Sequence, residues 1–416
     1  MESNSNIDDI MYLERTLSKA LKKTASSFPV ILVTGPRQVG KTTLLEHSIG
    51  KGVSYVSLDS LADRELAQTD PALFIQRYPP PVIIDEVQYA PALFPNIKIE
   101  VDRRKKKGLF WLTGSQQFHL MKNLSETLAG RVAILQLQGL SQSEQDKRAS
   151  FSLPFVPTAD FATRAAKHHS PISLQQLYQR IWSGTFPAAV LEGIDHDLFY
   201  NSYLQTYIQR DVRDLAQVGN ENTFLQFVRA VAARSGQLLN RADIARDVGV
   251  DNKTVKHWLS ILETSGLIYL LQPYHTNLTK RLVKTPKLYF LDTGLCCFLT
   301  RWTSADTLEA GAMSGAIFET FVIGEIIKSY WHNARTGTFY FYRNKDQKEI
   351  DMLIEQDGQL YLIEIKKTAN PDKGSVKNFA TLRNHKLPVA DGAILCMLEK
   401  HLPLDRDTLA IPVAYL

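Results

Sequence analysis

Nine residues near the start of the chain have the types and spacing of a loop that binds phosphate. They read G-x-x-x-x-G-K-T-T and lie between an apolar, β-branched run and a helical pattern, the context that such a loop requires. Glycines let backbone N–H groups surround an anion, the lysine reaches the β- and γ-phosphates, and the first threonine can hold Mg²⁺. The residues predicted to bind ATP are Gly35, Pro36, Arg37, Gln38, Val39, Gly40, Lys41, Thr42 and Thr43, with Thr42 also a predicted Mg²⁺ ligand.

An acidic pair ends a second apolar run further along the chain. Residues 82–84 are Val-Ile-Ile, and Asp85 and Glu86 follow them directly. An acid at the carboxyl end of a buried strand can hold Mg²⁺, which is the role predicted for Asp85. Glu86 can then polarise the attacking water. An acidic turn after a buried strand is the alternative interpretation, and the phosphate-binding loop upstream favours the catalytic one.

Two more positions could take part in ATP hydrolysis. Ser115 follows the apolar run 109–112 and could sense the γ-phosphate, with Gln116 and Thr113 as alternatives; Ser115 could also cap a helix. Arg131 could reach a phosphate in the same subunit or in a neighbouring one, and a plain surface arginine is an equally good interpretation. The predicted catalytic residues are Glu86, Lys41, Ser115 and Arg131.

A second constellation of charged residues lies near the end of the chain. Asp351 in one predicted strand and Glu364 and Lys366 in the next place two carboxylates and an ammonium at neighbouring points of a sheet. Two carboxylates can bind Mg²⁺, and the lysine can activate water for attack on a phosphodiester. Glu319 or Glu325 in the preceding helix would complete a nuclease-like site. The alternatives are a salt-bridged strand pair and an inactive nuclease-like domain kept for binding.

Between these constellations the sequence predicts a helix-turn-helix. Residues 239–259 read as a helix, a glycine-centred turn and a second helix, and two apolar runs that look like a wing follow. In a DNA-binding interpretation, Asn252, Lys253 and Lys256 face a major groove. The alternative is that this part only packs on the ATP-binding domain or on a protein partner.

The composition is ordinary for a soluble globular protein. The chain has 416 residues, 44% hydrophobic and 22% charged, with a net charge of +5, which is compatible with nucleic acid but does not argue for it. The length suggests about two to four domains. Three cysteines lack metal-ligand spacing and are expected to be reduced and buried. The polar N-terminus and the absence of a long apolar run predict a cytoplasmic protein without a membrane span.

The whole pattern resembles the bacterial and archaeal AAA-type P-loop ATPases that carry an uncharacterised C-terminal domain. The resemblance implies an α/β P-loop NTPase domain of the additional-strand class with a five-stranded parallel sheet. It further implies a helical and winged-helix part and an α+β domain like the PD-(D/E)xK restriction endonucleases. The expected domains are 1–140 (ATPase), 141–221 (linker and helical lid), 222–300 (winged helix-turn-helix) and 301–416 (endonuclease-like). The motifs that carry the resemblance are residues 35–42, 84–88, 112–115, 128–131 and 291–295, Asp351, and residues 364–366.

These observations predict a Mg²⁺-dependent ATPase whose nucleotide state controls C-terminal domains that bind a partner or DNA. One alternative is a DNA-binding nuclease that ATP regulates. Another is a nucleotide-dependent switch or adaptor with little turnover. An arginine finger from a neighbouring copy would require a homo-oligomer. The sequence identifies neither the pathway nor the partner.

Overall fold

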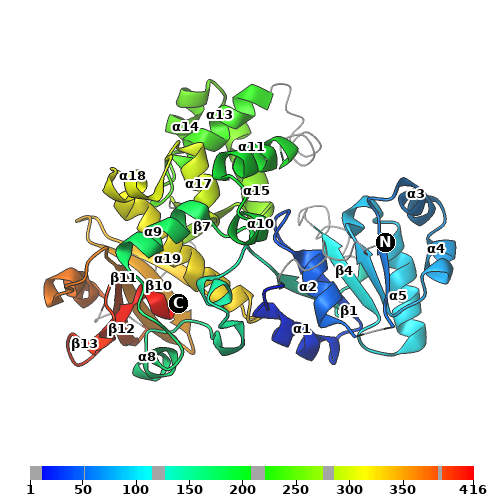
Figure 1. Ribbon diagram of the computed structural model, residues 1–416, viewed down its shortest axis with the longest axis horizontal. Helices are drawn as coiled ribbons and strands as arrows, with labels where there is room; N and C mark the ends of the chain where they lie inside the picture. Colours follow the sequence, from blue (N-terminus) through cyan, green and yellow to red (C-terminus); the bar gives the residue numbers. More distant parts are fainter. Residues whose placement is uncertain (1–11, 51, 115–126, 208–220, 275–284, 383–386) are drawn as a thin grey trace, which may run out of the picture.

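The computed structural model describes residues 12–50, 52–114, 127–207, 221–274, 285–382 and 387–416. It contains two β-sheets that lie at opposite ends of the molecule (Figure 1). The N-terminal α/β part, blue to cyan, lies at one end, and the C-terminal sheet, orange to red, lies at the other. A group of helices from the middle of the chain rises above the C-terminal part.

The N-terminal sheet has five parallel strands, which confirms the predicted P-loop fold. Their order is β2-β3-β4-β1-β5, so the strand that leads into the phosphate-binding loop lies between two neighbours. All five positions of this central strand are buried, because helices cover both faces of the sheet. The strands are β1 (Val30–Thr34), β2 (Ser54–Ser57), β3 (Val82–Asp85), β4 (Phe110–Gly114) and β5 (Val132–Gln136).

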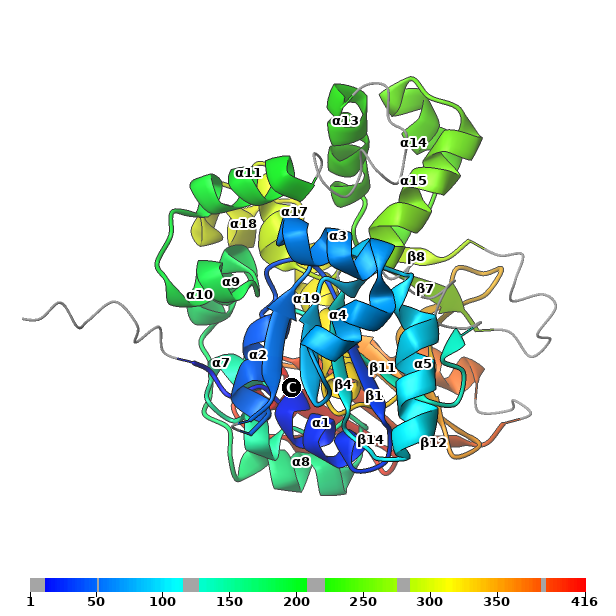
Figure 2. The same ribbon diagram turned by 90° about the vertical axis from the view of Figure 1, so that its right-hand side faces the viewer.

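Alternate residues of β1 face two different hydrophobic cores. Ile31 and Val33 pack with α1 and α2, whereas Val30 and Leu32 pack with α3, α4 and α5. Figure 2 accordingly shows α2 and α5 on opposite sides of the strands. The helices of this part are α1 (Leu17–Ala25), α2 (Lys41–Ser48), α3 (Leu61–Thr69), α4 (Pro71–Arg77), the 3₁₀ helix η1 (Val87–Tyr89) and α5 (Leu93–Arg104).

The second sheet has nine strands and joins two regions that were expected to be separate domains. Its order is β13-β14-β12-β11-β10-β9-β7-β8-β6, and β7 pairs in parallel with β9. The predicted wing is therefore continuous with the C-terminal sheet across the expected boundary at residue 300. The strands are β6 (Gln237–Leu238), β7 (Ile268–Pro273), β8 (Lys287–Phe290), β9 (Phe339–Arg343), β10 (Glu349–Gln356), β11 (Gln359–Ile365), β12 (Val389–Cys396), β13 (Leu402–Pro403) and β14 (Thr408–Pro412).

Helices connect and cover the two sheets. In the predicted helix-turn-helix, α14 ends at Gly249, whose φ of 75° suits glycine, and Asp251 then caps α15 through the Thr254 N–H. The helices are α7 (Gln142–Gln145), α8 (Ala159–Ala166), α9 (Leu174–Ser183), α10 (Pro187–Leu191), α11 (His196–Tyr207), α13 (Glu221–Ala232), α14 (Arg241–Val248), α15 (Asn252–Thr264), α17 (Thr293–Leu299), α18 (Ala305–Ala310) and α19 (Ser314–Trp331), with 3₁₀ helices η2 (Ala149–Phe151), η4 (Lys373–Thr381) and η5 (Val413–Tyr415).

The segment that starts at Ser141 was expected to be a linker or an insertion. Its first residues are instead part of the interior, because Gln142 and Glu144 have no exposed surface. The three cysteines are buried and carry free thiols, as predicted. Among the described helices, none is long and apolar enough to cross a membrane.

Candidate active site

The loop between β1 and α2 has the backbone that anion binding requires. Gly35 has a φ of 154°, and a Cβ there would overlap the Leu137 carbonyl, so no larger residue fits. Gly40 caps α2 with a φ of 83°. The first turn of α2 begins at Lys41, so its N–H groups and the positive end of its dipole lie at the loop. Within the loop, Lys41 Nζ donates to the carbonyls of Pro36 at 2.7 Å and Gly35 at 3.1 Å.

Asp85 lies at the centre of the site and receives hydrogen bonds from three hydroxyl groups. Thr42 Oγ1 donates to Asp85 Oδ1 at 3.0 Å, and Tyr55 OH donates to Oδ2 at 3.1 Å. Thr113 Oγ1 also donates to Oδ1. Burial and the adjacent Asp85 charge raise the pKa of Tyr55 to about 12, so Tyr55 stays a proton donor at neutral pH. The three donors hold the carboxylate without neutralising it.

Glu86 follows β3 in an unusual backbone conformation. Its φ is 56°, a left-handed value that is uncommon for a residue other than glycine. Residues in such conformations are often found at functional sites. Its N–H donates to Thr113 Oγ1 at 3.1 Å, and Gln88 Nε2 donates to its carboxylate. Thr113 therefore contacts both acidic residues of the site, and its role as a sensor residue stays a prediction.

The donor set suits Mg²⁺, which prefers oxygen ligands. The Thr42 hydroxyl group and the Asp85 carboxyl group lie 3.0 Å apart beside the phosphate-binding loop. When bound, the ion would neutralise charge on the ATP phosphates, and Thr42 and Asp85 are the residues that would hold it.

Other predicted site residues lie in different places. Arg37 Nη2 donates to Tyr89 OH at 3.4 Å, whereas Gln38 and Thr43 are exposed. Ser115 and Gln116 lie outside the described residues.

Arg131 does not reach this site within the same subunit. Its carbonyl accepts from Val30 N–H, so it lies where β1 begins, whereas the phosphate-binding loop lies where β1 ends. Five residues of strand separate the two edges by about 15 Å. The Arg131 guanidinium forms two hydrogen bonds with Asp102, at 2.7 and 3.0 Å, in a partly exposed pair. The predicted role within its own subunit is therefore wrong.

Sequence reasoning missed two residues that contact the site. Tyr55 was interpreted only as part of a strand, although β2 lies next to β3 and both strands end at the same edge of the sheet. Arg15 is buried, and its Nη1 donates to the Val39 carbonyl inside the phosphate-binding loop at 2.8 Å. No local motif marks Arg15, since its partners lie far along the chain.

The second constellation is only partly assembled as predicted. Asp351 and Glu364 are neighbours on the antiparallel strands β10 and β11. Lys366 Nζ lies 2.7 Å from Glu364 Oε1 and 3.6 Å from Asp351 Oδ2. Asp351 Oδ2 also accepts from Ile365 N–H at 2.8 Å, and Glu364 Oε2 is buried without a hydrogen-bond partner. Burial and the Asp351 charge raise the pKa of Glu364 to about 8.

An unpredicted lysine occupies this carboxylate cluster. Lys287 Nζ, from β8, lies 3.1 Å from Glu319 Oε1 and 2.5 Å from Glu349 Oε1. Tyr289 OH donates to Glu319 at 2.6 Å. Burial opposes the charge of Lys287, but the surrounding carboxylates outweigh it and raise the pKa of this lysine. Among the described residues, no group of three His, Cys, Asp or Glu side chains is placed to hold a metal ion.

Glu325 lies in a different environment from Glu319, although both belong to α19. It is buried, its Oε1 pairs with Lys328, and its Oε2 accepts from Gln142 N–H at 2.8 Å. The alternative that Glu325 completes the nuclease-like site is therefore wrong. In the helix-turn-helix, Asn252, Lys253 and Lys256 are all exposed on α15.

Known proteins match the chain along most of its length. A model of the AAA domain matches residues 27–145, and two domains of unknown function, DUF8612 and DUF4143, match residues 174–306 and 314–416. Uncharacterized proteins of Mycobacterium tuberculosis and Mycobacterium bovis are each 30% identical over 410 residues, which is 97% of this chain and 84% of theirs. The chain belongs to the family of these mycobacterial proteins. It is an ATP-binding protein and an ATPase of the AAA P-loop type.

Among solved structures, the ATPase is similar to the Walker-type ATPase of Pyrococcus abyssi. The two are 16% identical, with a TM-score of 0.43, over 68% of this chain and 94% of the archaeal one.

Proposed function

We propose that the nucleotide state of this ATPase controls the position of its C-terminal part, which binds a partner or DNA. In the hydrolytic step, Glu86 accepts a proton from the attacking water, and Lys41 and the loop N–H groups hold the phosphates. The observation that carries the proposal is a buried ionic network. It begins in the phosphate-binding loop and ends at the last turn of α19.

Arg15 and Glu144 form the centre of this network. Arg15 Nη1 binds the Val39 carbonyl in the loop, and Nη2 donates to the Gln138 carbonyl at 2.7 Å. Arg15 Nε lies 3.1 Å from Glu144 Oε2. Glu144 also accepts from the Thr16 and Ser141 N–H groups, each at 2.8 Å. A movement of the Val39 carbonyl would therefore shift Arg15 and its ion pair with Glu144, which connects the start of α1 with α7.

His332 extends the network into the C-terminal part. It follows α19, its Nδ1 lies 3.3 Å from Glu144 Oε1, and its Nε2 accepts from Gln138 N–H at 3.1 Å. Burial lowers the pKa of His332, so the ring is neutral at pH 7 and its proton is on Nδ1. Arg15, Glu144 and His332 are 4%, 0% and 1% exposed, so water does not screen their interactions.

A second contact brings the end of the helix-turn-helix to the same loop. Gly266 follows α15, and a Cβ placed there would lie 3.2 Å from Pro36 Cγ and 3.0 Å from Gln138 Nε2. The loop that receives the phosphates thus lies close to the turn that follows the helix carrying Lys253 and Lys256. This arrangement favours control of that part by nucleotide.

Hydrogen–deuterium exchange tests the coupling without requiring the partner. In Glu86→Gln, which retains ATP, we expect ATP to change exchange in residues 324–332 by about fivefold or more. Arg15→Lys in the same background should retain ATP binding and lose most of this change, because lysine cannot form the forked contact. The matched control is Arg103→Lys, which alters a surface ion pair with Glu100 on α5. Equal exchange with and without ATP would contradict the proposal.

The same protein can show whether the partner is DNA. We expect duplex DNA to bind Glu86→Gln differently in the presence of ATP and ADP, and Lys253→Glu with Lys256→Glu to abolish binding. No binding in either state would instead favour a protein partner. A homo-oligomer is part of the proposal because Arg131 is partly exposed and can reach phosphate only in a neighbouring copy. Sedimentation with and without ATP tests this point.

A second candidate function is DNA cleavage, favoured by the contact of Lys366 with both Asp351 and Glu364. Lys287 argues against it, because its ammonium already pairs with Glu319, the glutamate that would complete the site. The test is incubation of duplex and single-stranded DNA with Mn²⁺. Cleavage that disappears in Asp351→Asn would support a nuclease, and intact DNA would exclude one under these conditions.

A further inference from the structure

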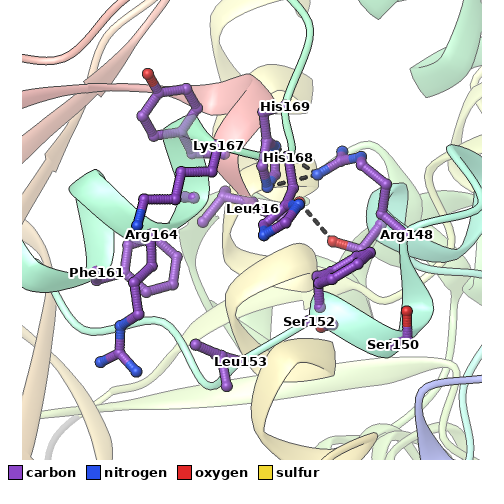
Figure 3. A pocket seen from close by; sticks show the side chains of 14 residues that line it. Arg148, Ser150, Ser152, Leu153, Phe161, Arg164, Lys167, His168, His169 and Leu416 are labelled. Atoms are coloured by element: carbon purple, nitrogen blue, oxygen red, sulfur yellow. Dashed lines mark hydrogen bonds between the residues drawn. The ribbon is translucent and has the colours of Figure 1, made fainter.

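A basic cavity lies away from the phosphate-binding loop, with none of residues 35–43 in its lining. It has a volume of about 380 Å³ and lies between η2, α8 and η5 (Figure 3). Its basic lining residues are Arg148, Arg164, Lys167, His168 and His169. No Asp or Glu is among the described residues that line it. We propose that this cavity binds a nucleotide unit, meaning a phosphate together with its base.

The cations approach the cavity from two sides. Figure 3 shows Arg148 on one side, Arg164 and Lys167 on the other, and the two histidines between them. Arg148 pairs with Asp146 at 2.6 Å and Arg164 pairs with Asp160, and both aspartates lie outside the lining. Lys167 has no carboxylate partner among the described residues. The charge of Lys167 is therefore available to attract a phosphate.

The side chain of His169 forms part of the cavity wall and is neutral. His169 Nδ1 donates to the Ala414 carbonyl, which leaves Nε2 to face Arg148 Nη1 as an acceptor. Burial and the Arg148 charge lower the pKa of His169 to about 4, so the ring is neutral at pH 7. His169 and Asp146 together hold Arg148 in one orientation. A preformed arginine loses little entropy when it binds phosphate.

An aromatic surface lies next to these cations. Phe151 and His168 stack with a centroid distance of 3.9 Å and an interplanar angle of 12°. Phe151 is 56% exposed and Leu153 is 39% exposed, so the apolar side of the cavity is open to a ligand. Ser150 and Ser152 add hydroxyl groups. Aromatic rings beside cations are the combination that binds single nucleotides and single strands, because bases stack while phosphates pair.

The cavity borders the network described above. Ser143 lines it and lies next to Glu144, and Ser143 Oγ donates to the Leu416 carbonyl at 3.1 Å. If the proposed coupling holds, occupancy of the cavity and the state of the phosphate-binding loop influence each other. Binding itself does not rest on that coupling, so it is tested without ATP.

The experiment measures fluorescence anisotropy of a labelled thymidine pentanucleotide with the full chain. Neither this probe nor thymidine monophosphate, the competitor, carries the triphosphate that the ATP site requires. We expect Lys167→Glu and Phe151→Ala each to weaken binding by about tenfold or more, through lost charge attraction and lost stacking. Both residues are exposed, so these variants retain the fold.

Two control variants separate this cavity from other basic surfaces. Lys106→Glu changes an exposed lysine near the end of α5, and Lys373→Glu changes an exposed lysine at the start of η4. We expect both to alter binding by less than about twofold. Competition by the monophosphate at similar affinity would identify a free nucleotide as the ligand, and its failure while the strand binds would identify a single strand. No binding to wild type, or loss only in a control variant, would overturn the proposal.

Discussion

The ATP site and the C-terminal carboxylate cluster use the same residue types in opposite ways. In the ATP site, neutral hydroxyl groups of Thr42, Tyr55 and Thr113 surround Asp85, and these contacts bring no positive charge to it. In the cluster, the ammonium group of Lys287 contacts Glu319 and Glu349 directly. A carboxylate held by hydroxyl groups still attracts a metal ion, whereas one paired with lysine is already neutralised.

This difference shows why carboxylate spacing alone is a weak guide to chemistry. Both regions place acids at points of a sheet where a metal could bind. Whether a metal ion can bind depends on the charge of the side chains that approach these acids from other helices and strands. Four predictions test this comparison, beginning with the largest expected effect.

The substitution Glu86→Gln tests the ATP site. We expect ATP hydrolysis to fall by about 10² to 10⁴-fold, because glutamine cannot accept the proton of the attacking water, while ATP binding persists. Phosphate release and binding of a fluorescent ATP analogue measure the two effects. Glu65→Gln, an exposed change on α3, is the control and should hydrolyse ATP like wild type. Unchanged hydrolysis in Glu86→Gln would contradict its assigned role.

The substitution Lys287→Met tests the C-terminal carboxylate cluster. Removing this buried ammonium leaves the partly buried Glu319 without its lysine partner and Glu349 with Arg343 alone, so the unfolding free energy should fall by about 2–4 kcal/mol. Mn²⁺ should raise the melting temperature of this variant more than that of wild type, since the ion can replace the lost charge. Lys345→Met changes an exposed lysine and is the control. Equal stability of wild type and Lys287→Met would show that the lysine does not balance the cluster.

The pH dependence of stability gives a third test. The pKa of Glu364 rises from 4.5 to about 8 on folding, so the folded protein holds a proton that the unfolded chain releases. The stability from this group is present below pH 4.5 and is lost as the pH rises through 8. Relative to Glu364→Gln, wild type should lose on the order of 2 kcal/mol between pH 5 and pH 9. Urea denaturation of both proteins across this range measures it, and a difference that is constant with pH would refute the expected protonation.

Tyr55→Phe should have the smallest effect. It removes one of the three hydroxyl donors to Asp85 and should reduce hydrolysis by about threefold to tenfold, with most of the loss in the apparent affinity for Mg²⁺. Tyr78→Phe removes a similar tyrosine–aspartate hydrogen bond, to Asp63, and is the matched control. Equal Mg²⁺ dependence in both variants would show that Tyr55 does not support the metal site.

Local motifs explain why the ATP site could be predicted from the sequence. The loop 35–43 and the acidic pair 85–86 are contiguous segments, and each follows a strand of one parallel sheet. Parallel strands bring their carboxyl ends to one edge, so segments far apart in the chain must meet there. Arg131 does not join the site because it precedes its strand and therefore lies at the opposite edge of the sheet.

The sequence alone could not show which of Glu319 and Glu325 lies in the carboxylate cluster. Both lie on α19, which is buried on nearly every side, so no polar face indicates which glutamate meets which neighbour. Six residues correspond to about one and two-thirds helical turns, and the two carboxylates therefore point to different elements. Glu319 meets the strand that carries Lys287, and Glu325 meets Gln142.

The sequence by itself determined the phosphate-binding loop, the position of the acidic pair after its strand and the order of the strands' apolar runs, because these depend on neighbours within a few residues. Only the tertiary structure decided that Arg15 joins the loop to Glu144 and His332, and that Lys287 enters the carboxylate cluster. Those partners come from distant segments. Their pairing depends on which buried charges the packed elements bring within 4 Å, and burial makes each unpaired charge costly.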